Sequence, residues 1–103
     1  MKDNVVKDKS LEFAVRIVNL YKFLVNEQKE FVMSKQILRS GTSIGANIRE
    51  AEQAQSRADF INKLNIALKE ANETEYWLEL LIRTEYITCL LYTSPSPRDR
   101  QKS

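Results

Sequence analysis

The sequence contains no histidine, and its 103 residues include only one cysteine, two prolines and two glycines. Without histidine there is no imidazole to act as a general base, and the usual Cys/His zinc sites cannot be assembled. A single cysteine cannot form a disulfide framework within the chain. We therefore expect no enzyme, no cofactor and no metal site.

Long hydrophobic runs are absent as well. Charged residues interrupt every apolar stretch well before it reaches the ~20 residues that span a bilayer, and the N-terminus shows no signal-peptide pattern. We expect a cytoplasmic protein without a membrane partner.

The net charge of +2 lies far below that of a dedicated nucleic-acid-binding domain. A hydrophobic content of 43% argues against disorder throughout.

The composition changes abruptly near residue 89. No proline or cysteine occurs in residues 1–88, where thirteen basic side chains balance thirteen acidic ones, whereas Pro95 and Pro97 exclude a helix in the tail. The segment CLLYTSPSPRD, residues 89–99, resembles the translation of a transposon-end adapter used in preparing sequencing libraries. We expect a helical domain over residues 1–88, followed by a non-native, largely irregular tail over residues 89–103.

Apolar spacing in residues 1–88 predicts three long helices, over residues 11–27, 33–53 and 57–84. Ser10 or Asp8 is the expected N-cap of the first helix. Ser56 and Asp59 have the S-x-x-D spacing of a capping box, which predicts that the third helix begins near Arg57. Short connectors between long helices favour an all-α, antiparallel up-down bundle.

The first and third helices each carry two apolar stripes. The first helix has Leu11, Ala14, Val18, Tyr21 and Val25 on one stripe, and Phe13, Ile17, Leu20 and Leu24 on the other. The third has an inner stripe of Phe60, Leu64, Ala67, Ala71, Thr74, Leu78 and Leu81, and a second stripe of Ile66, Trp77 and Leu80. Three helices cannot cover so many faces, so the pattern predicts a fourth helix, a neighbouring subunit, or both. We expect Ile66, Trp77 and Leu80 to lie at such an interface.

Gly41 and Gly45 are four residues apart within the second predicted helix. A phosphate-binding loop would need Gly-Lys-Ser/Thr at the second glycine, and this is absent. An interior glycine costs about 1 kcal/mol relative to alanine, so its packing must compensate, and we favour close helix packing or a local bend over ligand binding.

Two groups of charged residues invite functional interpretation. Glu70, Glu73, Glu75 and Glu79 suggest a carboxylate-bridged metal pair, but such sites in bundles normally add histidines. Glu73 lies on the Trp77 side, where it could bond across to another helix. The candidate nucleic-acid-binding residues are Arg39, Arg49, Arg57 and Lys63, yet they alternate with acidic residues as a solvated surface also does. In a ring, these modest charges would repeat around one axis.

Two strings in the centre of the chain, LRSGTSIGANIREA (residues 38–51) and IALKEANETEYWL (residues 66–78), resemble the 23S rRNA intervening-sequence proteins of bacteria. LEFAVRIVNLYKFL (residues 11–24) resembles the first helix of that family, and the similarity covers most of residues 8–88.

The resemblance implies a four-helix bundle that assembles into a ring, typically a homopentamer, and no catalytic residues carry over from it. Of the four helices, this chain retains three, because the adapter-like segment begins where the fourth helix should start. The implied function is a non-catalytic scaffold that binds RNA or DNA. The alternative is a protein–protein adaptor, such as the accessory protein of a reverse transcriptase in a diversity-generating retroelement.

Overall fold

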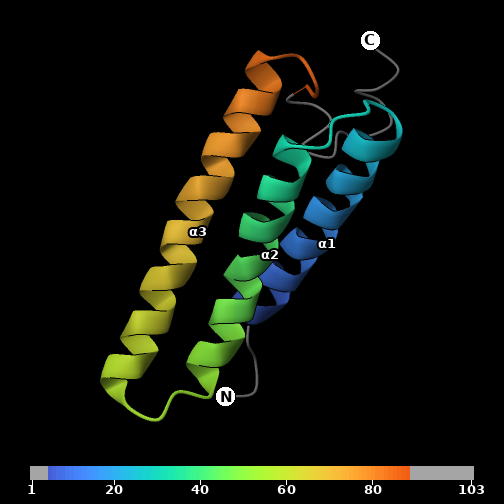
Figure 1. Ribbon diagram of the computed structural model, residues 1–103. Coiled ribbons are helices and arrows are strands. Elements are labelled where there is room, and N and C mark those ends of the chain that lie inside the picture. The colour runs from blue at the N-terminus through green and yellow to red at the C-terminus, as the bar shows by residue number, and fades with distance from the viewer. Residues whose placement is uncertain (1–4, 89–103) are drawn as a thin grey trace.

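The computed structural model describes residues 5–88, which form three α-helices and the turns between them (Figure 1). The helices are α1 (Val5–Asn26), α2 (Met33–Glu52) and α3 (Arg57–Arg83). α2 lies between α1 and α3 and packs against both, whereas α1 and α3 make little contact with each other (Figure 1). The predicted all-α, up-down bundle of three long helices is confirmed. The predicted tail, residues 89–103, lies outside the described residues.

The predicted ends of the second and third helices agree with α2 and α3 to within one residue. α3 begins as the capping box predicts, because the Asp59 N–H donates a 3.1 Å hydrogen bond to Ser56 Oγ. Local side-chain chemistry at this turn is therefore sufficient to place the start of α3.

The predicted start of the first helix is wrong. α1 is already helical at Val5, and Asp8 lies in its first turn instead of at the N-cap. Ser10 is buried within the helix, where its hydroxyl donates to the Lys7 carbonyl at 2.9 Å. Residues 5–10 contain neither proline nor glycine, so nothing in this segment prevents the helix from continuing past Ser10.

A buried carboxylate caps the start of α2. Glu30 is 7% exposed, and its side chain accepts backbone N–H hydrogen bonds from Val32, Met33 and Ser34 at 3.1, 2.9 and 2.7 Å. Val32 occupies the N-cap position but provides no side-chain hydrogen bond. Glu30 thus satisfies N–H groups that a helix start leaves without partners, and its charge is favourable there.

The main apolar core lies at the end of the bundle where α1 ends, α2 begins and α3 ends. All three helices and the turn after α3 contribute buried side chains to it: Ile17, Leu20, Leu24, Ile37, Leu78, Leu81 and Ile87. Trp77 and Phe13 are among the half-buried residues that pack against this cluster. On α1, the stripe that contains Ile17 therefore faces the core.

Gly41 is where α1 and α2 approach each other closely. A Cβ atom at Gly41 would lie 2.8 Å from Cγ1 and 2.9 Å from Cγ2 of Ile17, a side chain that is 1% exposed. At Gly45, the nearest atom to an added Cβ is Ser10 Oγ, at 3.2 Å. The geometry supports the interpretation that the glycines allow close packing, and the constraint is tighter at Gly41.

We predict that Gly41→Ala destabilises the fold by about 1–3 kcal/mol, because overpacking against stiff, buried Ile17 outweighs the gain in helix propensity. Gly45→Ala is the matched control and should stay within about 1 kcal/mol of the wild type, since Ser10 offers a looser contact. Urea denaturation followed by circular dichroism measures both. In an Ile17→Ala background the penalty at Gly41 should disappear, and an unchanged penalty there would contradict the assigned contact.

We also predict that Glu30→Ala lowers the free energy of unfolding by about 1–2 kcal/mol, as loss of an N-cap does. Glu30→Gln should lower the free energy of unfolding by a smaller amount, because an amide oxygen still accepts hydrogen bonds. Part of the stabilisation is lost with the favourable charge. Glu27→Ala, at an exposed position in the same connector, is the control. Equal urea midpoints for Glu27→Ala and Glu30→Ala would rule out the capping role.

Candidate functional site

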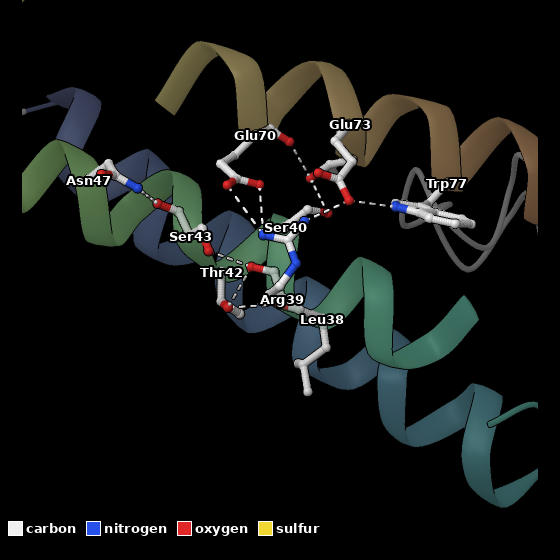
Figure 2. A network of polar contacts seen from close by, with 10 residues as sticks. Leu38, Arg39, Ser40, Thr42, Ser43, Asn47, Glu70, Glu73 and Trp77 are labelled. Atoms are coloured by element: carbon white, nitrogen blue, oxygen red, sulfur yellow. Dashed lines mark hydrogen bonds and ion pairs between the residues drawn. The ribbon is translucent and has the colours of Figure 1, made fainter. Parts of the chain in front are cut away.

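Arg39 on α2 is held by two glutamates of α3 (Figure 2). Its Nη1 atom lies 3.1 and 3.2 Å from the two carboxylate oxygens of Glu70, and its Nη2 atom lies 2.6 Å from Glu73 Oε2. The same Glu73 oxygen accepts a 3.0 Å hydrogen bond from the indole N–H of Trp77. Arg39 thus joins α2 to two successive turns of α3.

Beneath this ion-pair network lies a buried hydroxyl pair. Thr74 Oγ1 lies 2.8 Å from Ser40 Oγ and 2.8 Å from the carbonyl oxygen of Glu70. A hydroxyl has one proton and a carbonyl can only accept, so Thr74 donates to Glu70 and Ser40 donates to Thr74. Ser40 and Thr74 are 0% and 2% exposed. The contact between α2 and α3 therefore has a buried polar centre and a solvent-exposed ionic edge.

The network perturbs the titration of its charged groups. The Arg39 hydrogen bond, and after it the Trp77 hydrogen bond, lower the pKa of Glu73 below its ordinary value. Reciprocally, the Glu73 carboxylate raises the pKa of Arg39. Both shifts favour the charged forms, as expected for an ion pair supported by hydrogen bonds. The predicted possibility that Glu73 bonds to another helix is thereby realised, with Arg39 as its partner.

The four candidate nucleic-acid-binding residues lie in different electrostatic surroundings. Arg39 is committed to Glu70 and Glu73, and Lys63 pairs with Glu50 at 2.8 Å, a contact that raises the Lys63 pKa. Arg49, in the last turn of α2, and Arg57, the first residue of α3, are both exposed. Of the predicted set, Arg39 and Lys63 are thus held in ion pairs, whereas Arg49 and Arg57 take part in none found within residues 5–88.

The predicted interface residues Ile66, Trp77 and Leu80 are each half-buried. Trp77 packs against the main core, and its ring meets that of Tyr76 edge-on with centroids 5.1 Å apart. Apart from Tyr76, the exposed large apolar side chains of α3 lie in its N-terminal half: Phe60, Ile61, Leu64 and Leu68, which are 42%, 46%, 38% and 60% exposed. We call these four residues the α3 apolar stripe.

Sequence periodicity alone did not identify the α3 apolar stripe as exposed. It assigned Phe60 and Leu64 to the inner stripe because they continue the spacing of buried Ala67 and Thr74. The sequence nevertheless indicated that some apolar residues would be exposed, since α1 and α3 carry more of them than one covered face needs. On α1 the surplus is exposed at Leu11 and Val15, which are 50% and 52% exposed.

Residues 5–88 contain no group of three or more His, Cys, Asp or Glu side chains that could hold a metal ion. Glu70 and Glu73 instead serve Arg39, and Glu79 pairs with Arg83 at 3.1 Å. No helix in this part of the chain is long and apolar enough to cross a membrane.

We predict that Glu73→Gln lowers the free energy of unfolding at pH 7 by about 0.2–1 kcal/mol, the range of exposed ion pairs. Because the folded-state pKa of Glu73 is lowered, its stabilising contribution is complete above the ordinary glutamate pKa. It is lost as the pH falls through the lowered value. Wild-type stability should therefore decline more steeply in acid than that of Glu73→Gln.

Fluorescence of Trp77, the only tryptophan in the sequence, measures both effects. Glu75→Gln is the matched control, because Glu75 is exposed on the same helix. Acid sensitivity that is equally reduced in Glu73→Gln and Glu75→Gln would contradict a specific role for the Arg39–Glu73 pair.

Comparisons with known proteins agree with this architecture. The chain matches the family described as 23S rRNA-intervening sequence protein over residues 2–94, while no curated protein matches it. It is also similar to a crystallised protein of unknown function from the S23 ribosomal protein family of Bacteroides thetaiotaomicron VPI-5482. That similarity has 96% sequence identity and a TM-score of 0.85, and it covers 87% of this chain and 83% of that chain. Neither the family nor the crystallised protein carries the name of an enzyme. The chain belongs to the 23S rRNA-intervening sequence protein family.

Proposed function

We propose that this protein is a non-catalytic scaffold, a helical bundle that associates with further copies of itself. The observation that carries the proposal is the α3 apolar stripe together with exposed Leu11 and Val15 on α1. Monomeric proteins seldom expose contiguous apolar patches larger than a few hundred Å², and larger patches mark sites of association. Four neighbouring large side chains on three turns of one helix fit that description.

Burial of this stripe supplies a driving force for assembly. Transfer of apolar surface from water stabilises by about 25 cal/mol per Å², so even partial cover of four large side chains contributes several kcal/mol. Family membership supports a closed ring, and the resemblance favours five subunits. The fourth helix expected from the family would share in covering the same surplus of apolar surface.

Binding of RNA or DNA is the second part of the proposal, and exposed Arg49 and Arg57 favour it. Assembly would repeat these charges in each subunit, so a weak patch on one copy becomes a stronger one on the oligomer. In this proposal the bundle holds the nucleic acid and does not process it.

The alternative function is that of a protein–protein adaptor, such as an accessory protein of a reverse transcriptase. In that case the α3 apolar stripe would hold a different protein instead of a second copy. The genomic neighbourhood separates the two: a reverse-transcriptase gene beside variable repeats favours the adaptor, and flanking ribosomal RNA sequence favours the scaffold.

We predict that the wild-type chain has a molar mass several times its 12.0 kDa chain mass in size-exclusion chromatography with light scattering. Leu68→Lys should shift the mass toward the monomer, because a charge at the centre of an apolar contact is costly to bury. Folding should persist, since Leu68 is 60% exposed within the chain. Asn62→Lys adds the same charge at another exposed position of α3 and should leave the mass unchanged. A monomeric wild type, or equal effects of the two lysines, would contradict self-association through this stripe.

A further inference from the structure

Two arginines, Arg49 and Arg57, flank the turn between α2 and α3. Arg49 lies in the last turn of α2 and Arg57 begins α3. The turn that joins these two helices lies at one end of the bundle (Figure 1). Both side chains are exposed. None of the ion pairs found within residues 5–88 involves either of them.

The carboxylates close to these arginines in the sequence interact with lysines. Glu50, the neighbour of Arg49, pairs with Lys63 at 2.8 Å, and Glu52 pairs with Lys7 at 3.7 Å. Asp59, two residues after Arg57, acts electrostatically on Lys63. Two of these acids are thus paired with lysines, whereas neither arginine takes part in an ion pair found within residues 5–88.

Arg57 also stands at an unusual place for a cation. The N-terminus of a helix carries a partial positive charge, which favours anions and disfavours a basic side chain in the first turn. An anion close to this point would be attracted by both the helix terminus and Arg57. Asp59 supplies one negative charge in this first turn, and the Arg57 side chain remains exposed to an external anion.

The opposite holds at Arg39. A phosphate approaching its guanidinium meets Glu70 and Glu73, whose oxygens lie 3.1 and 2.6 Å from the arginine nitrogens. Lys63 presents the same difficulty, because Glu50 stays beside it. Such surface pairs are weak and can be broken, but the adjacent carboxylate continues to repel a phosphate.

We infer that Arg49 and Arg57 are the residues of this surface that contact the phosphate backbone of a nucleic acid, and that Arg39 and Lys63 do not. The inference rests on the proposed nucleic-acid binding and narrows it to one end of the bundle. Backbone contacts carry no base specificity, so the expected ligand is RNA or DNA of any sequence.

Salt-dependent fluorescence anisotropy with a labelled 20-nucleotide single-stranded RNA tests this inference. Each phosphate contact contributes about 0.7 to the slope of log Kd against log salt concentration for single strands. The double variant Arg49→Gln/Arg57→Gln should flatten the slope by about 1.4 per chain engaged and weaken binding at least several-fold. The control Arg39→Gln/Lys63→Gln removes the same two charges and should preserve the wild-type slope. Thermal melts establish that both variants are folded.

Each outcome bears on a distinct claim. A flattened slope in the Arg49/Arg57 variant alone supports the inference. Equal losses in both variants would show a general charge effect and overturn it, as would a loss confined to the Arg39/Lys63 variant. Absence of RNA binding by the wild type would instead refute the proposed nucleic-acid binding itself, and with it the inference, while leaving self-association standing.

Discussion

The close approach of α2 to both of its neighbours is the constraint on which the rest of the structure depends. On the α1 side, the lack of a side chain at Gly41 lets Ile17 come within the space that a Cβ would occupy. On the α3 side, fully buried Ser40 meets Thr74 across a 2.8 Å hydrogen bond. A central helix with small side chains at its contacts can pack against both partners, while α1 and α3 make little direct contact with each other. The surplus apolar surface of the outer helices follows directly from this arrangement.

Charge is organised around the same central helix. The ionic edge of α2 is provided by Arg39 against α3, while Lys63 reaches from α3 to Glu50 and Lys7 reaches from α1 to Glu52. These pairs explain how a domain with equal numbers of acidic and basic residues can still display local positive charge. Near the α2–α3 turn, Glu50 and Glu52 pair with lysines, whereas no ion pair found within residues 5–88 involves Arg49 or Arg57. Net charge therefore says little about this protein, whereas the placement of each carboxylate says a good deal.

Sequence patterns were sufficient for the fold because they depend on features local to each helix. Periodicity located α2 and α3, and the Ser56–Asp59 spacing placed the start of α3. Features that depend on how one helix is rotated against another were not accessible in this way. Periodicity placed Phe60 on the angular stripe of Ala67 but could not show that its end of α3 is left uncovered. Likewise, the capping role of Glu30 requires the connector to fold back on α2, and the spacing of polar residues does not encode that path.

The central claim is that the uncovered stripe on α3 is a contact surface between copies of this chain. Hydroxyl-radical footprinting over a range of protein concentrations tests it most directly, because Phe60 lies in the stripe while Tyr76, 59% exposed on the same helix, lies outside it. The account predicts that oxidation of Phe60 falls as the protein associates, whereas oxidation of Tyr76 stays constant. Oxidation of Phe60 that is independent of concentration, in samples shown to be associated, would contradict it.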